Sequence, residues 1–162
     1  MGDFYKQIQG WFDFENVYDR AVSEAPPHAV FVEIGAWLGR STAYLAQRIK
    51  DSGKGIRLYV VDTWKGSPNE PAHQDVVRRA GGSIYPVFLE NMRRAQVADV
   101  VLPMPMRSDQ AVESFADESL DFVFVDSSHR YEDVVRDLSL WYPKVKLGGV
   151  LAGHDYHSGW PD

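Results

Sequence analysis

The sequence predicts a doubly wound α/β fold, in which helices cover both faces of a mostly parallel sheet. Short apolar runs alternate along the chain with amphipathic stretches, which is the order expected of strands connected by helices. Several runs are apolar at nearly every position, as is typical of strands buried on both sides. Acidic residues follow several of these runs, at the edge of the sheet where such folds bind ligands.

The elements follow from these patterns in chain order. We expect five strands, at 29–35, 56–62, 98–104, 120–126 and 148–155. Helical spacing of apolar residues predicts helices over 4–24, 40–50 and 131–146. The last of these begins with acidic residues and ends with lysines, an arrangement that the helix dipole favours. The segment 64–97 is interrupted by Gly and Pro, and we expect a loop followed by one or two helices.

Length and composition indicate one folded domain. The chain has 162 residues, of which 44% are hydrophobic and 13% aromatic, so disorder and fibrous repeats are excluded. We divide it into a helical lead at 1–28, a ligand-binding core at 29–156 and a tail at 157–162.

Charge and cysteine content narrow the classes of partner. The net charge of −6 disfavours nucleic acid and anionic membrane surfaces as partners. The chain has no cysteine, which excludes disulfides, Cys-bound zinc and iron–sulfur clusters. We find no signal peptide and no apolar run of membrane-spanning length, and we expect a soluble cytoplasmic protein.

A glycine-containing turn, EIGAWLGRS at 33–41, follows the first predicted strand. Gly35 and Gly39 allow a sharp turn and close approach of a ligand. The dinucleotide fingerprint requires a second glycine where this chain has Trp37, and a bulky indole there disfavours NAD and FAD. The turn therefore suits an adenosine-containing ligand without phosphates.

Three polar groups near this turn indicate which ligand that is. Asp62, at the end of the second strand, is placed to accept hydrogen bonds from both ribose hydroxyls. Glu33 could hold an ammonium group, while Ser41 and the following helix N-terminus could meet a carboxylate. Ribose, ammonium and carboxylate together describe S-adenosylmethionine. The alternative is that the glycines serve only close packing and that Asp62 caps a turn.

The arrangement resembles the class I S-adenosylmethionine-dependent methyltransferases, which are Rossmann-like. The stretch VDSSHRYEDVVRDLSLWYPKVKLGGVLAGHDY (125–156) is similar to a group related to macrocin-type sugar O-methyltransferases and, more distantly, to catechol O-methyltransferases. The resemblance covers about residues 29–156 and implies methyl transfer to a hydroxyl of a sugar or other small natural product. A non-catalytic cofactor-binding domain and a nicotinamide-dependent oxidoreductase are the alternatives.

The resemblance also implies residue roles. Asp126 corresponds to a ligand of a divalent cation, Mg or Mn, and to a residue that contacts the cofactor. His129 corresponds to a general base. Asp155 matches a second metal ligand, whereas His154 stands where catechol-type enzymes carry an aspartate. On the residues alone, Asp126 could equally hydrogen-bond the turn, and His129 could be an ordinary surface histidine.

Four further residues are candidates for adenine contacts. Ser108, Asp109 and Gln110 follow the third strand at the place where related enzymes bind adenine, although a helix N-cap by Ser108 or Asp109 explains them nearly as well. Trp64 could cover the adenine, or it could simply pack in the core.

The chain stops at residue 162, shortly after the fifth predicted strand. The fold it resembles adds a helix and two further strands, which we expect to be absent here. An open fifth strand is prone to pair with another chain unless it is covered. We therefore expect a homodimer, with a small-molecule acceptor as the other partner.

Overall fold

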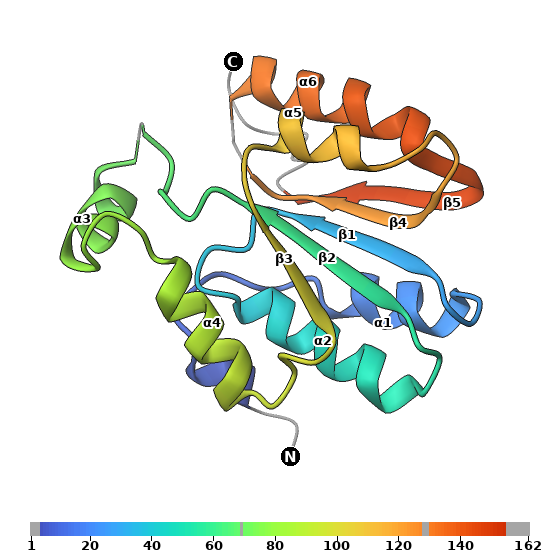
Figure 1. Ribbon diagram of the computed structural model, residues 1–162, viewed down its shortest axis with the longest axis horizontal. Helices are drawn as coiled ribbons and strands as arrows, with labels where there is room; N and C mark the ends of the chain where they lie inside the picture. Colours follow the sequence, from blue (N-terminus) through green and yellow to red (C-terminus); the bar gives the residue numbers. More distant parts are fainter. Residues whose placement is uncertain (1–3, 69, 128–129, 155–162) are drawn as a thin grey trace.

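Five parallel strands form a single sheet in the order β3-β2-β1-β4-β5 (Figure 1). The computed structural model describes residues 4–68, 70–127 and 130–154. The strands are β1 Val30–Ile34, β2 Arg57–Asp62, β3 Val101–Pro105, β4 Leu120–Val125 and β5 Val145–Gly153. Because the chain leaves β1 toward β2 on one side and returns to β4 on the other, the order of strands reverses between β1 and β4. A doubly wound sheet binds its ligands at this point.

The predicted strands are confirmed, with shifted ends for two of them. The third begins at Val101 rather than 98, after a turn in which the amide of Val100 donates to the carbonyl of Val97. The fifth already begins at Val145, inside the predicted helix, because Val145 pairs with Leu120 of β4 ahead of an irregularity in the β4–β5 register. Pro143 lies in the short 3₁₀ helix that separates α6 from β5.

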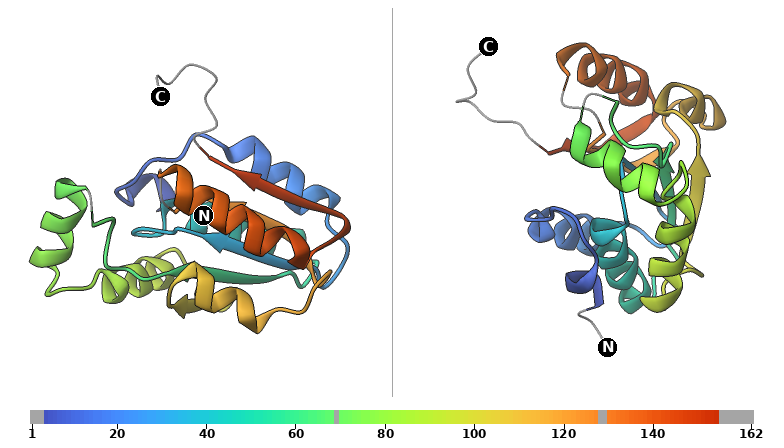
Figure 2. Two further views of the ribbon diagram at one scale, coloured as in Figure 1. Left: turned by 90° about the horizontal axis from the view of Figure 1, so that it is seen from above. Right: turned by 90° about the vertical axis from the view of Figure 1, so that its left-hand side faces the viewer.

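Helices lie on both faces of the sheet, as predicted (Figures 1 and 2). They are α1 Glu15–Glu24, α2 Arg40–Ser52, α3 Pro71–Arg79, α4 Tyr85–Arg94, α5 Ser108–Ala111 and α6 Tyr131–Trp141. The described residues also form three short 3₁₀ helices, Phe4–Gln7, Val112–Ser114 and Tyr142–Lys144. Helices α1, α2 and α4 pack on one face and α5 and α6 on the other, whereas α3 lies at the margin of the first layer and adds the buried Val77 to it.

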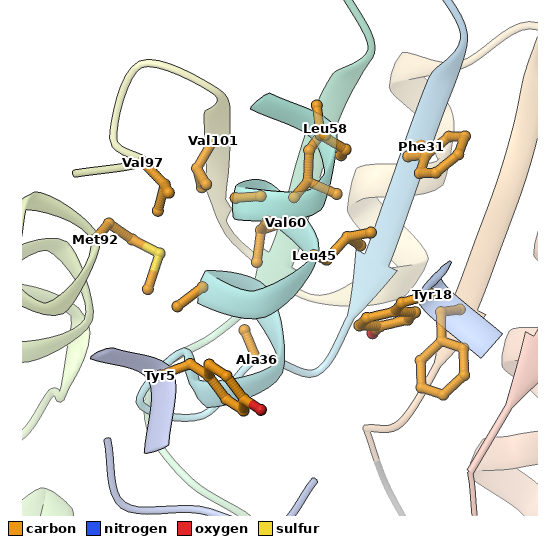
Figure 3. Packing of buried hydrophobic residues seen from close by; sticks show 14 of the residues in the cluster. Tyr5, Tyr18, Phe31, Ala36, Leu45, Leu58, Val60, Met92, Val97 and Val101 are labelled. Carbon is orange, nitrogen blue, oxygen red and sulfur yellow. The ribbon is translucent and has the colours of Figure 1, made fainter. Parts of the chain in front are cut away.

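Alternation along the strands divides the core into two layers. Phe31, Leu58 and Val60 face α2, and Figure 3 shows the side chains of this layer gathered around Leu45. The other layer, on the opposite face, joins residues of β1, β2 and β4 to α5 and to the fully buried Trp141 of α6. Burial on both faces explains why these strands are apolar at almost every position.

In the N-terminal region, the prediction of one helix over 4–24 is wrong. A 3₁₀ turn at Phe4–Gln7 is followed by the non-helical segment 8–14, and α1 begins only at Glu15. Gly10 has φ of 150°, which breaks a helix, and Phe14 packs against Phe124 of β4. None of the helices in the described ranges is long and apolar enough to cross a membrane.

Candidate functional site

A cavity of about 1150 Å³ opens at the carboxyl-terminal ends of the strands. All five strand ends contribute to its lining, through Ile34, Asp62, Met106, Asp126 and His154. Its remaining walls come from the N-terminal segment 8–14, the turn after β1, the segment leading into α3, and α6. The cavity thus occupies the place where the sequence predicts ligand binding.

The two glycines of the turn after β1 have different roles. Gly35 lines the cavity with φ of +88°, and a Cβ there would lie 1.9 Å from the carbonyl oxygen of Asp126. Only glycine allows the ends of β1 and β4 to approach this closely. Gly39 is not among the lining residues, and a Cβ there would meet Met92 and Phe88 of α4. Gly39 therefore serves close packing.

Asp62 lies in the cavity wall and organises the glycine turn. Its Oδ2 accepts hydrogen bonds from the amides of Ala36 and Trp37, both 2.9 Å, and its Oδ1 accepts one from Trp64, 2.7 Å. Burial raises the pKa of Asp62, although the three amides act in the opposite direction. A carboxylate has about four acceptor positions, so one remains. The predicted bonds from Asp62 to the ribose hydroxyls stay a prediction, for which this position is available.

Glu33 differs from its predicted placement, because its carboxylate faces the core beside α1 and α2 and does not line the cavity. Tyr18 and Ser41 donate to its Oε1, both at 2.7 Å, and Thr42 donates to its Oε2. Burial, opposed by these hydroxyls, raises the pKa of Glu33 to about 7, and the charge of Asp126 adds to the rise. The ammonium contact expected for Glu33 has no support in this geometry.

Residues at the start of α2 lie beside the same network. Ser41 lines the cavity, but its hydroxyl donates to Glu33. Arg40, the first residue of the helix, also lines the cavity and was not predicted as a site residue. Its neighbours in sequence, Gly39 and Ser41, were the only signal that could have drawn attention to it.

The adenine candidates after β3 are only partly brought together. Ser108 and Asp109 line the cavity, Ser108 accepting a bond from the indole of Trp141 at 2.7 Å. Asp109 forms two hydrogen bonds with Arg107, and this pairing lowers the pKa of Asp109. Gln110 lies outside the lining, where its side chain accepts from the amide of Arg107. Arg107 is itself the N-cap residue of α5, so neither Ser108 nor Asp109 caps it.

Trp64 is a core residue. It is fully buried, packs against the rings of Tyr85 and Phe88 of α4, and does not line the cavity. The geometry thus gives Trp64 the packing role, and it corrects the prediction that its ring covers the adenine.

The ends of β4 and β5 bring two of the predicted metal ligands together. Nδ1 of His154 lies 3.8 Å from Oδ1 of Asp126, and Nε2 of His154 lies 2.9 Å from Oδ1 of Asp13. His129 and Asp155 lie outside the described residues. Within the described ranges, no group of three or more acidic, histidine or cysteine side chains gathers as a metal site.

Two features of the cavity have no counterpart in the sequence patterns. Asp137 of α6 is buried and accepts a hydrogen bond of 2.8 Å from Ser127, yet it occupies an ordinary position in an amphipathic helix. His73 of α3 stacks on Trp37 with ring centres 4.2 Å apart and also contacts Trp11. These contacts join three segments that are distant in sequence, so no local signal announces them.

Fold and site together define a class of protein. A parallel sheet in this order, a glycine turn after β1, an aspartate ending β2 and a cavity at the strand ends describe a Rossmann-like domain, a class in which adenosine-containing ligands bind at the strand ends. Residues 32–156 match the family described as "Methyltransferase domain", and the chain belongs to that family. The predicted membership among class I S-adenosylmethionine-dependent methyltransferases is confirmed at this level.

The individual proteins that this chain resembles share only a small part of its sequence. The chain is 26% identical over 125 residues to the uncharacterized protein y4gI of Sinorhizobium fredii, a match that covers 76% of this chain and 13% of y4gI. The solved O-methyltransferase NovP shares the fold with a TM-score of 0.67 and 20% identity, over 88% of this chain and 64% of NovP. The S-adenosylmethionine-dependent O-methyltransferase TM0748 of Thermotoga maritima shares the fold with a TM-score of 0.59 and 13% identity, over 90% of this chain and 45% of TM0748. The chain thus spans less than two thirds of each of these proteins.

Proposed function

We propose that the protein transfers a methyl group from S-adenosylmethionine to a hydroxyl oxygen of a small-molecule acceptor, a sugar or other natural product. The observation that carries this proposal is the cavity at the strand ends, in which the carboxylate of Asp62 organises the glycine turn beside Gly35. Membership of the methyltransferase family supports it. The O-methyltransferases NovP and TM0748 share this fold.

The proposed cofactor position follows the order of the strand ends. The adenosine part lies over β2 and β3, where Asp62 has one acceptor position left for a ribose hydroxyl and Ser108 and Asp109 border the adenine. The methionine part then lies over β1 and β4, beside Gly35 and Asp126. Carboxylates near the sulfonium favour binding of the positively charged cofactor.

The reaction we propose is a single displacement. The acceptor oxygen attacks the methyl carbon, the new C–O bond forms as the S–C bond breaks, and the sulfur keeps the bonding electron pair in S-adenosylhomocysteine. The acceptor proton passes to a base, for which we propose His129. The protein's part is to hold oxygen, carbon and sulfur in line and to exclude water.

A divalent cation, Mg or Mn, is part of the proposal. Oδ1 of Asp126 and Nδ1 of His154 lie 3.8 Å apart, and an oxygen donor with one imidazole is a ligand set that would suit such a cation. With Asp155 they would hold the cation. When bound, it would lower the pKa of the acceptor hydroxyl.

Calorimetric titration with S-adenosylhomocysteine, with and without Mg, tests the proposal. We expect binding by the wild-type chain and a loss of affinity of roughly 10-fold or more in Asp62→Asn, because a charged hydrogen bond to the ribose and the order of the glycine turn both depend on Asp62. Asp121→Asn is the matched control, because Asp121 binds the amide of Val30 and Lys146 outside the cavity.

The outcomes separate the candidate functions. Binding followed by formation of S-adenosylhomocysteine with a hydroxyl acceptor is the result we expect. Tight binding without turnover across a panel of sugar and phenolic acceptors would favour a non-catalytic cofactor-binding domain. A folded wild-type chain that binds no S-adenosylhomocysteine would refute the proposal.

A further inference from the structure

Four arginines line the cavity, and one of them differs from the others. Arg107, Arg130 and Arg136 each lie within ion-pair distance of a carboxylate on Asp109, Glu132 and Asp133 respectively. Arg40 has no carboxylate partner among the described residues. It is therefore a cavity cation whose charge the described part of the chain leaves unbalanced.

The guanidinium of Arg40 forms one hydrogen bond that holds it in place, but its Nε donor has no partner among the described residues. Its Nη1 donates to the carbonyl oxygen of Gly10 at 2.9 Å, which fixes the side chain against the N-terminal segment 8–14. Its Nε is buried and has no hydrogen-bond partner in the described structure. A buried donor without a partner costs about 1–3 kcal/mol, so an anionic ligand that reaches this group gains both a charge interaction and the missing hydrogen bonds.

The rest of the cavity favours cations. Seven carboxylate side chains line it, against the four arginines: Asp13, Asp62, Glu70, Asp109, Asp126, Asp133 and Asp137. The lining thus carries more negative than positive side chains, which suits a sulfonium and an ammonium, and Arg40 is the lining arginine without an ion-pair partner among the described residues. A zwitterionic amino-acid group, with one carboxylate and one ammonium, matches this distribution of charge.

The position of Arg40 agrees with the cofactor position proposed above. Arg40 is the first residue of α2 and directly follows the turn whose amides at Ala36 and Trp37 are held by Asp62. The hydroxyl of Ser41, the group expected to meet the cofactor carboxylate, is engaged with Glu33 instead. Arg40 thus supplies the positive charge at the methionine end of the cavity, where the sequence had indicated only a serine and a helix N-terminus.

We infer that Arg40 binds the carboxylate of the methionine group of S-adenosylmethionine and makes the cavity selective for ligands that carry this carboxylate. The inference rests on the proposed function. Guanidinium groups form paired hydrogen bonds with carboxylates, which gives the contact both strength and a defined orientation.

Comparison of two ligands tests the inference by calorimetry. S-adenosylhomocysteine carries the carboxylate, and its decarboxylated analogue differs only in lacking it. We expect the wild-type chain to prefer S-adenosylhomocysteine by roughly 10- to 100-fold, the range of a hydrogen-bonded charge pair. Arg40→Gln should abolish this preference by weakening S-adenosylhomocysteine alone, and Arg40→Lys should retain part of it.

The matched control is Arg48→Gln, which removes a cation from the same helix. Arg48 pairs with Asp19 at 2.8 Å and does not line the cavity, so the variant should keep the wild-type preference. Thermal melts of all three variants establish that each is folded.

Each other outcome overturns the inference in a distinguishable way. An equal loss of affinity for both ligands in Arg40→Gln would mean that Arg40 affects binding only by holding Gly10 and the N-terminal segment in place. A wild-type chain that binds both ligands equally would overturn the inference and leave the proposed function standing. A wild-type chain that binds neither would overturn both.

Discussion

The buried carboxylate of Glu33 makes the stability of the fold depend on pH. Burial raises its pKa from 4.5 to about 7, so between these values the folded protein binds a proton that the unfolded chain releases. Stability contributed in this way is fully present below pH 4.5 and is lost as pH rises through about 7. One pKa unit corresponds to about 1.4 kcal/mol, so the free energy of unfolding should fall by about 3 kcal/mol over this window.

Glu33→Gln removes the titrating group while keeping an acceptor oxygen for the hydroxyls of Tyr18 and Ser41, and its amide NH2 can donate to the hydroxyl oxygen of Thr42. We expect the variant to lack this fall, so that the difference between wild type and variant changes by about 3 kcal/mol between pH 4.5 and pH 8. Urea unfolding at closely spaced pH values measures this difference. Titrating groups other than Glu33 are common to both proteins, so their contributions cancel in the difference.

Two further variants sharpen the experiment. Tyr18→Phe removes a hydroxyl that lowers the pKa of Glu33, so the fall in stability should move to higher pH. Glu24→Gln, which removes an exposed carboxylate from α1, should keep the wild-type pH dependence. The reasoning is refuted if wild type and Glu33→Gln run parallel from pH 4.5 to 8, because Glu33 would then be ionised in the fold throughout, with its three hydroxyl partners outweighing burial.

Two other predictions concern the backbone and the sheet edge. Gly35→Ala places a Cβ 1.9 Å from the carbonyl oxygen of Asp126 and should lower the free energy of unfolding in urea by more than ~3 kcal/mol. Gly53→Ala, also at positive φ but with open space around it, should cost only ~1 kcal/mol, and equal costs would contradict the steric argument. The homodimer stays a prediction: if β5 pairs across it, Leu147→Lys at the exposed Leu147 should shift sedimentation equilibrium toward monomer. A wild-type chain that sediments as monomer at micromolar concentration would rule the dimer out.

The sheet was predictable because its signals are local. Runs such as 120–126 are apolar on both faces, and that pattern needs no knowledge of the partner strands. Where the prediction failed, a distant contact decided the outcome: Val145 joins the sheet because Leu120 pairs with it, and Phe14 leaves the helix register to stack on Phe124.

The same division runs through the site. Asp62, Asp126 and His154 reach one cavity because strand ends in a parallel sheet converge, which the sequence pattern implies. Their hydrogen bonds could not be predicted, since they depend on which groups tertiary packing brings within 3 Å of each oxygen. Residue type and position therefore locate the site, but they do not assign each side chain its partner.

The hydrogen-bond partners found in the structure change which group we expect to contact the cofactor. The hydroxyl of Tyr18, fifteen positions before Glu33, donates to the Glu33 carboxylate together with the hydroxyls of Ser41 and Thr42. The polar groups of Glu33, Ser41 and Thr42 near the glycine turn are therefore hydrogen-bonded to each other. A polar group that is already satisfied has little to offer a ligand, whereas an unsatisfied one has a free energy of about 1–3 kcal/mol to recover. By this criterion we expect the cofactor carboxylate to meet the guanidinium of Arg40, whose Nε has no hydrogen-bond partner among the described residues, rather than the hydroxyl of Ser41.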